Sequence, residues 1–173
     1  MEEVKRAFWN KGNSLEPCCD LSDYPAIHKR VWGMFVSSFR RTPCGYPMSR
    51  LKCDENVGLF AMKAELLIRG MLRIVDTCGW CIITTPRRRN RENHFATNVC
   101  RVISADIGVP FYEDAVIARS RHRVGAEFEL TREIGERNVI IYDDILTTGS
   151  TAHSMIRLLK DRNIFVVIGV NNN

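Results

Sequence analysis

The run from Val139 to Thr151 constrains this chain more than any other stretch of its sequence. It reads VIIYDDILTTGST, which is four apolar residues, two adjacent carboxylates and a short polar loop with one glycine. The continuous and mostly β-branched apolar segment predicts a buried strand over 139–142, and a helix is expected over 151–161. Asp143 and Asp144 then lie at the carboxyl end of a strand, where open α/β sheets place their ligands.

The loop after the two carboxylates has the composition of an anion-binding turn. Its residues are Thr147, Thr148, Gly149, Ser150 and Thr151. A residue without a Cβ lets backbone N–H groups approach an anion closely, and the start of the following helix adds its positive end. Carboxylates beside such a loop suit the hydroxyls and phosphate of a phosphorylated sugar. The alternative is an ordinary strand–turn–helix with an aspartate N-cap, which needs only one Asp.

This run resembles the signature of type I phosphoribosyltransferases, which bind phosphoribosyl pyrophosphate (PRPP). The family pattern is four apolar residues, two acidic residues and a Thr/Gly-rich loop that closes on Thr. The resemblance implies that Asp143 and Asp144 hold the ribose hydroxyls, directly or through Mg²⁺ and its waters. It also implies that the residues from Thr147 to Thr151 hold the 5-phosphate, and that Mg²⁺ is the cofactor.

A second constellation follows an apolar segment earlier in the chain. Thr84, Thr85 and Pro86 run into Arg87-Arg88-Arg89-Asn90-Arg91, so four arginines occupy five positions. These charges repel one another unless they share an anion, and the guanidinium fork fits phosphate oxygens in pairs. In the family resembled, the corresponding loop binds pyrophosphate, which implies that role for Thr84, Thr85, Pro86, Arg87 and Arg88. A solvated basic face or a nucleic-acid contact are the alternatives.

Alternating strand and helix patterns predict an α/β fold with a largely parallel sheet. The predicted strands are 80–84, 115–118, 139–142 and 165–170, and the predicted helices before the PRPP motif are 24–41, 57–75 and 92–107. Residues 1–56 are expected to form an N-terminal arm or hood that is partly helical, and residues 57–173 the core. The resemblance implies a Rossmann-type layered fold of the type I phosphoribosyltransferase kind for that core.

The order of the segments is most similar to the ComF-like subgroup of this family. Val124, Gly125, Ala126 and Phe128 resemble a patch that precedes the PRPP motif there. The resemblance covers roughly Leu59 to Val170, and it implies that the loop from Arg119 to Phe128 closes over the site. Two features differ, since the subgroup's N-terminal zinc finger is missing and the loop is short.

Relatives that use oxopurines carry Asp where this chain has Thr147, so a 6-oxopurine acceptor is less expected.

Bulk composition limits the classes of protein that fit. The chain has 173 residues, 45% hydrophobic and 26% charged, with a net charge of +5 that suits an anionic ligand or nucleic acid. It has no apolar run of membrane-span length and no signal pattern, so a cytoplasmic protein that does not bind membranes is expected.

The seven cysteines are odd in number and irregularly spaced, which does not indicate a disulfide framework. Cys78 and Cys81 are interpreted as structural. Zinc binding with Cys18, Cys19 or Cys53, and redox chemistry, remain open.

The expected activity is that of a glycosyltransferase of the phosphoribosyltransferase class, acting in nucleotide salvage. It would move the 5-phosphoribosyl group of PRPP to a nitrogen acceptor, most simply a nucleobase, and release pyrophosphate. Asp143, Asp144 and Arg87 are the expected catalytic residues. A homodimer is also expected, and nucleic acid is a less favoured partner. The rivals are a non-catalytic ComF-like module that binds PRPP or nucleic acid, and a zinc-dependent adaptor.

Overall fold

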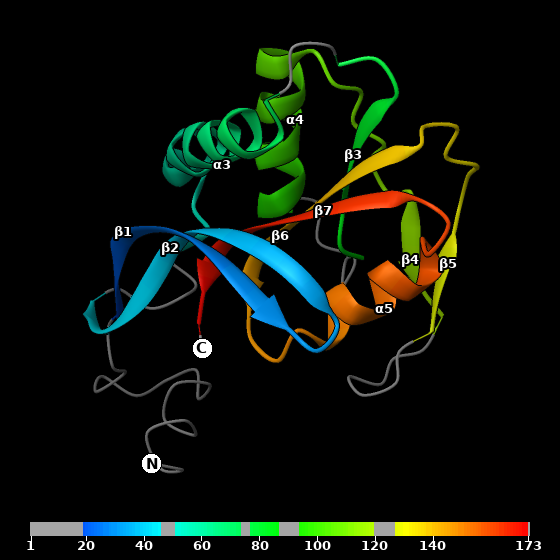
Figure 1. Ribbon diagram of the computed structural model, residues 1–173. Coiled ribbons are helices and arrows are strands. Elements are labelled where there is room, and N and C mark those ends of the chain that lie inside the picture. Colours follow the sequence, from blue (N-terminus) through cyan, green and yellow to red (C-terminus); the bar gives the residue numbers. More distant parts are fainter. Residues whose placement is uncertain (1–18, 46–50, 74–76, 87–93, 120–126, 173) are drawn as a thin grey trace.

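The computed structural model describes residues 19–45, 51–73, 77–86, 94–119 and 127–172, with backbone only at 19–20 and 42–45. Figure 1 shows the arrangement of the elements. The strands are β1 (Cys19–Arg30), β2 (Gly33–Gly45), β3 (Trp80–Thr84), β4 (Val116–Ala118), β5 (Phe128–Leu130), β6 (Asn138–Leu146) and β7 (Asn163–Asn171). The helices are the 3₁₀ turn η1 (Asp54–Asn56), α3 (Val57–Leu72), α4 (Phe95–Ile107) and α5 (Ser150–Leu158).

Five strands form the central sheet, in the order β1-β2-β7-β6-β3. The strands β2, β7, β6 and β3 run parallel to one another, and β1 pairs antiparallel with β2 at one edge. The short strands β4 and β5 pair in a separate antiparallel ladder. The prediction of an α/β fold with a largely parallel sheet is therefore confirmed. Because β3 and β6 are parallel neighbours, their carboxyl ends meet at one edge of the sheet.

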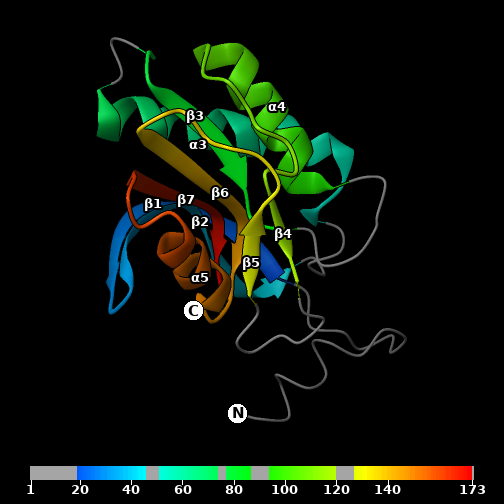
Figure 2. The same cartoon turned by 90° about the vertical axis from the view of Figure 1, so that its right-hand side faces the viewer.

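The sheet lies between two layers. Figures 1 and 2 show α3 and α4 on one face, with α5 and the β4–β5 ladder on the other. Alternate residues of each strand supply the two cores, so Ile82 and Ile140 pack with the α3 and α4 side, and Ile83 and Ile141 with the α5 side. Strands buried on both faces explain why the strand sequences are continuous apolar runs.

The predicted helix over 24–41 is wrong, because these residues form the β1–β2 hairpin. Apolar side chains there happen to fall at a helical spacing. Residues 35–39 of β2 are all buried, so the strand shows no alternation to reveal it. Pro25 sits at an irregularity in the β1–β2 register on the edge strand, a position that strands tolerate. Since β2 pairs with β7, residues 19–45 extend the sheet of the core, and no helical hood forms there.

Other boundaries differ by a few residues. The helix expected over 57–75 is α3, ending at Leu72, and the last helix ends at Leu158. The connection expected over 119–138 contains β5. The strand β6 continues to Leu146, so Asp143 and Asp144 lie within the last four residues of the strand and not beyond it. The predicted patch at 124–126 lies outside the described residues.

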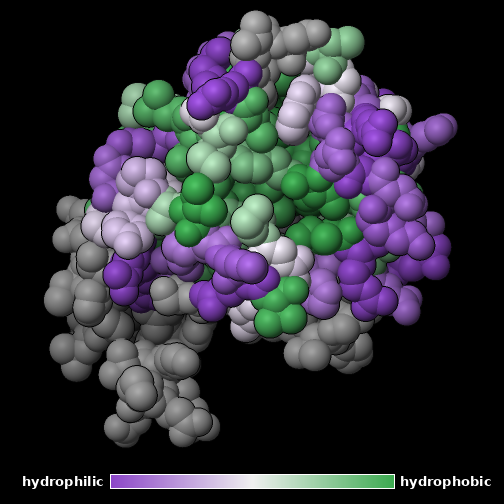
Figure 3. All heavy atoms as spheres, in the orientation of Figure 1, coloured by the Kyte–Doolittle hydropathy of each residue, from purple (hydrophilic) through white to green (hydrophobic). Residues whose placement is uncertain are grey.

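The face of the molecule seen in Figure 3 carries a patch of hydrophobic side chains bordered by hydrophilic ones. Large apolar side chains are exposed on the hairpin and on α3, among them Ile27, Met34 and Leu66. An exposed apolar patch such as the one in Figure 3 commonly marks a contact site. None of the described helices is long and apolar enough to cross a membrane.

Candidate functional site

The two sequence motifs meet at the carboxyl edge of the sheet. Thr84 pairs with Tyr142 in the β3–β6 ladder, and both Thr84 and Thr85 are 6% exposed. The Thr85 backbone N–H donates to the carbonyl of Tyr142 at 3.3 Å. The Thr85 hydroxyl donates to Oδ1 of Asp143 at 3.1 Å. A residue of the predicted pyrophosphate loop thus contacts a residue of the predicted PRPP motif, although 58 positions separate them.

The two adjacent carboxylates have different surroundings. Neighbouring residues of a strand point to opposite faces of the sheet, so Asp143 and Asp144 diverge. Asp143 is half-buried beside Thr85. Asp144 is only 8% exposed, and its Oδ2 forms an ion pair with Nζ of Lys52 at 2.6 Å. Lys52 lies just before η1 and α3, and this residue was not predicted from the sequence. A single lysine in a loop carries no pattern that would single it out.

Tyr142 directly precedes the two carboxylates in sequence and is completely buried. Burial raises the pKa of its phenol well above the usual range, and the nearby Cys100, Asp144 and Asp143 raise it further. The phenol is therefore neutral and remains a donor. Its oxygen has no hydrogen-bond partner among the residues that the structure describes. Within the part of the chain that the structure describes, Tyr142 thus supports the site by packing and not by a hydrogen bond.

The predicted phosphate loop turns into α5 through Gly149. This residue has a φ of +81°, in the left-handed region, and it precedes the first residue of α5. A Cβ at Gly149 would lie 2.8 Å from Nε1 of Trp32. Glycine is therefore required both by the backbone angle and by the close approach of the indole. Thr148 and Ser150 complete the turn, with their hydroxyl oxygens 3.1 Å apart and the Ser150 N–H donating to Oγ1 of Thr148 at 3.4 Å.

The tip of the β1–β2 hairpin contacts this loop through Trp32. The indole stacks on Phe35 with ring centroids 5.5 Å apart, and Phe35 stacks on His28 at 4.6 Å. His28 shares a 2.8 Å hydrogen bond with the hydroxyl of the buried Ser37. Burial, followed by the charge of Arg30, lowers the pKa of His28, so the imidazole is neutral near pH 7. This stack holds Trp32 against Gly149, a contact that the motif alone does not indicate.

The donor set at this edge suits a metal that arrives with other ligands. Asp143 and Asp144 offer carboxylate oxygens, which Mg²⁺ prefers. Within the described ranges, no group of three or more His, Cys, Asp or Glu side chains could hold a metal ion. A carboxylate here fits Mg²⁺ that keeps phosphate oxygens and water as its remaining ligands, and the two side chains do not form a complete protein cage. Arg87 and Arg88 lie outside the described residues.

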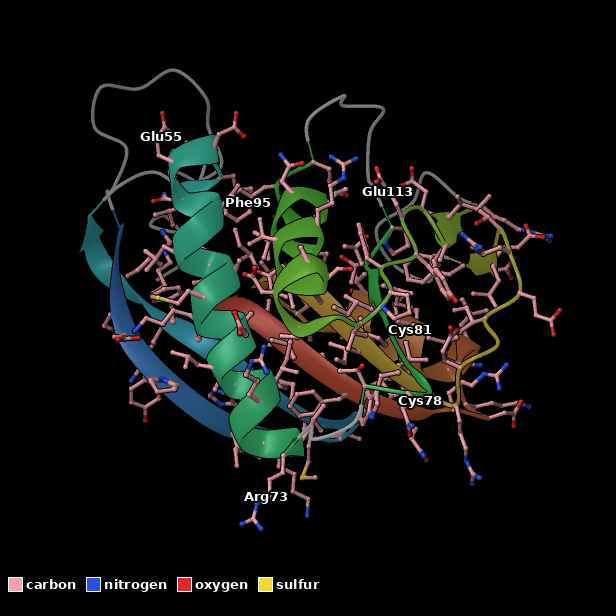
Figure 4. The ribbon with its side chains drawn as sticks, turned by 90° about the horizontal axis from the view of Figure 1, so that it is seen from above. Glu55, Arg73, Cys78, Cys81, Phe95 and Glu113 are labelled. Atoms are coloured by element: carbon pink, nitrogen blue, oxygen red, sulfur yellow. The ribbon has the colours of Figure 1, made fainter. Side chains whose placement is uncertain are left out.

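The CxxC pair lies away from this site. Figure 4 shows Cys78 at the opposite end of the layers from Glu55, which lies in η1, and Phe95, which begins α4. Cys81 is fully buried, and burial, followed by the nearby Glu136, raises the pKa of its thiol to about 12. A thiol that stays protonated is a poor nucleophile and a poor metal ligand. The structural interpretation of this pair is favoured over the redox one. Cys18 lies outside the described residues.

The chain matches no family model, and no curated protein matches its sequence. Among solved structures it is similar to a hypoxanthine phosphoribosyltransferase from Trypanosoma cruzi, with 18% identity over 68% of each chain and a TM-score of 0.49. An adenine phosphoribosyltransferase from Saccharomyces cerevisiae is 18% identical over 96% of this chain and 87% of that one, with a TM-score of 0.48. An orotate phosphoribosyltransferase from Aeropyrum pernix is 17% identical over 83% and 72%, with a TM-score of 0.46. The strand order and register define the fold independently of these likenesses.

Proposed function

We propose that this chain is a PRPP-dependent phosphoribosyltransferase that transfers the 5-phosphoribosyl group to a nitrogen of a nucleobase and releases pyrophosphate. The observation that carries the proposal is the 3.1 Å hydrogen bond between Thr85 and Asp143. It joins the segment that leads into the arginine run to the carboxylate pair that precedes the glycine turn at Gly149. Anion-binding groups on two loops beside two carboxylates suit a sugar with phosphates at both ends.

The proposed roles follow from position along the edge. Asp143 and Asp144 would hold the ribose hydroxyls, and the backbone N–H groups from Thr147 to Thr151 would hold the 5-phosphate at the start of α5. Thr84, Thr85 and Pro86, with Arg87 and Arg88 next in sequence, would hold the pyrophosphate as it leaves. Bound Mg²⁺ would supply positive charge to the pyrophosphate oxygens.

The protein's contribution to the reaction is positioning and charge stabilisation. As the bond from C1 of the ribose to pyrophosphate breaks, positive charge develops on the sugar and negative charge on the leaving group. The carboxylates would fix the sugar ring, and the donors of the segment that begins at Thr84 would meet the departing oxygens. Holding the acceptor nitrogen in line with C1 would supply the rest of the rate acceleration. No covalent bond to the protein is needed.

The finer assignments rest on the sequence. Thr147 stands where relatives that use oxopurines carry Asp, which favours an acceptor that is not a 6-oxopurine. The ComF-like grouping, nucleotide salvage, Mg²⁺ dependence and a cytoplasmic location remain predictions of the same kind. A homodimer is proposed as well, and burial of exposed apolar side chains such as Ile27, Met34 and Leu66 would support it.

Pyrophosphate release tests this proposal. The full chain would be incubated with PRPP, Mg²⁺ and a pool of nucleobases, beside an Asp143→Asn, Asp144→Asn variant. Release that requires one base and disappears in the variant is the expected result, and splitting the pool would then identify the acceptor. PRPP binding without pyrophosphate release would instead favour the non-catalytic module. Salt-dependent binding of DNA would support that alternative further.

A further inference from the structure

The ion pair between Lys52 and Asp144 places a cation on a carboxylate that PRPP and Mg²⁺ would use. Their charged atoms lie 2.6 Å apart, and the Asp144 side chain is 11% exposed while that of Lys52 is 41% exposed. A nearly buried carboxylate without a partner is costly, so the ammonium stabilises Asp144 when no ligand is present. The pair is therefore a feature of the ligand-free protein that ligand binding has to change.

The two partners differ in their freedom to move. Asp144 belongs to the inner strand β6, and its backbone carbonyl lies 2.7 Å from the position that a Cβ on Gly169 of β7 would take. Its backbone is held within the sheet. Lys52 sits beside Leu51, which is 6% exposed and whose carbonyl accepts a 3.1 Å hydrogen bond from Nδ2 of Asn56. The backbone at Lys52 is thus anchored, while its flexible, half-exposed stem leaves the ammonium free to change partner.

A lysine ammonium has three donors and no acceptor, so it can bind carboxylate or phosphate oxygens but not a metal ion. Mg²⁺ and Lys52 therefore compete for Asp144. PRPP carries phosphate oxygens that can receive the ammonium, whereas free Mg²⁺ offers nothing in exchange.

We propose that Lys52 is an exchanging counter-ion of this site: it holds Asp144 in the free protein and transfers its ammonium to phosphate oxygens of PRPP when ligand takes the carboxylate. This inference rests on the proposed function. It makes Lys52 a substrate-binding residue, and it makes divalent-metal binding weak until PRPP arrives. Removing the ammonium would then have opposite effects on two ligands, which a merely structural residue would not produce.

The experiment measures two affinities on the full chain. Mn²⁺ alone, as a spectroscopic probe for the divalent site, would be titrated by electron paramagnetic resonance, and PRPP with Mg²⁺ by calorimetry. We expect Lys52→Met to bind Mn²⁺ roughly tenfold more tightly and PRPP roughly tenfold more weakly than the wild type. Lys52→Arg, which keeps the charge, should stay close to the wild type in both. Lys52→Met with Asp144→Asn should lose the gain in Mn²⁺ affinity.

Lys63→Met is the matched control, because Lys63 forms an ion pair with Asp23 on the hairpin. It should change neither affinity. Unchanged affinities in Lys52→Met, or a loss of both with an unaltered circular dichroism spectrum, would overturn the inference. If the wild type binds no PRPP while Lys52→Met still gains Mn²⁺ affinity, the proposed function fails and transfer to PRPP fails with it. That result would still place Lys52 on the metal-binding carboxylate.

Discussion

The hydroxyl of Thr85 donates a 3.1 Å hydrogen bond to the carboxylate of Asp143, across the carboxyl ends of two parallel strands. This contact orients the first of two adjacent carboxylates, while Lys52 holds the second on the opposite face of the sheet. Each carboxylate thus has its own partner in the free protein, Thr85 on one face of the sheet and Lys52 on the other.

Replacing Thr85 by Val should weaken PRPP binding without unfolding the protein. The change removes one donor to a charged acceptor and keeps the side-chain shape, so a loss of roughly 3- to 10-fold in affinity is expected. Calorimetric titration with PRPP would measure it. Thr85→Ser, which keeps the hydroxyl, should bind as the wild type does. Equal affinity in the Val variant would show that the hydrogen bond has no role in the site.

Gly149→Ala should destabilise the fold and abolish tight PRPP binding. An alanine would be strained at a φ of +81°, and its Cβ would meet the Trp32 indole nitrogen at 2.8 Å. The expected loss is about 1–3 kcal/mol of unfolding free energy, from urea denaturation.

Gly70→Ala provides the matched comparison. Gly70 lies in α3, and a Cβ there would have nothing within 4 Å. This variant should gain about 0.5–1 kcal/mol because alanine favours helix. Equal effects of the two substitutions would contradict the account of the glycine turn.

Tyr142→Phe should leave the unfolding free energy unchanged or raise it by up to about 1 kcal/mol, because the buried hydroxyl has no partner among the described residues. Tyr112→Phe is the opposite case, since that hydroxyl donates to Glu136. It should lose about 1 kcal/mol. Urea denaturation of both variants gives the comparison. A larger loss in Tyr142→Phe than in Tyr112→Phe would mean that the Tyr142 hydroxyl binds a group at the site.

Stability should fall as the pH rises above about 9. The Cys81 thiol has a pKa of about 12 in the folded protein against 9.0 as its ordinary value, so between these values only the unfolded chain loses the proton. Unfolding free energy then decreases with pH, by up to about 1.4 kcal/mol per pH unit for one such group. The buried Cys100 acts in the same direction. Cys81→Ala should flatten this slope, measured by urea denaturation from about pH 8 to 10. An unchanged slope would show that Cys81 does not titrate in this way.

Local patterns were enough to predict much of the core. The helix α4 repeats its apolar residues at helical spacing, and β6 combines a continuous apolar run with two carboxylates at its end. The hairpin was missed because β2 is buried on both faces and so lacks the alternation that marks a strand. Gly33, which falls in the middle of the predicted helix and begins β2, was the available signal against a helix there.

The contacts that complete the site are long-range, and no local pattern predicts them. Lys52 reaches Asp144 from the segment before α3, and Trp32 reaches Gly149 from the tip of the hairpin. Each depends on which strands become neighbours, so it becomes visible only once the sheet is assembled. Thr85 and Asp143 were each predicted as site residues, yet their hydrogen bond also required the β3–β6 pairing.

Calorimetric titration of PRPP, in the presence of Mg²⁺, into the wild type and the Asp143→Asn, Asp144→Asn variant tests the central claim most directly. We expect one PRPP bound per chain in the wild type and an affinity at least roughly 100-fold weaker in the variant, because the variant would lose both proposed carboxylate contacts to the ribose. Equal affinities in the two proteins, or no binding by the wild type at about 1 mM PRPP, would contradict it.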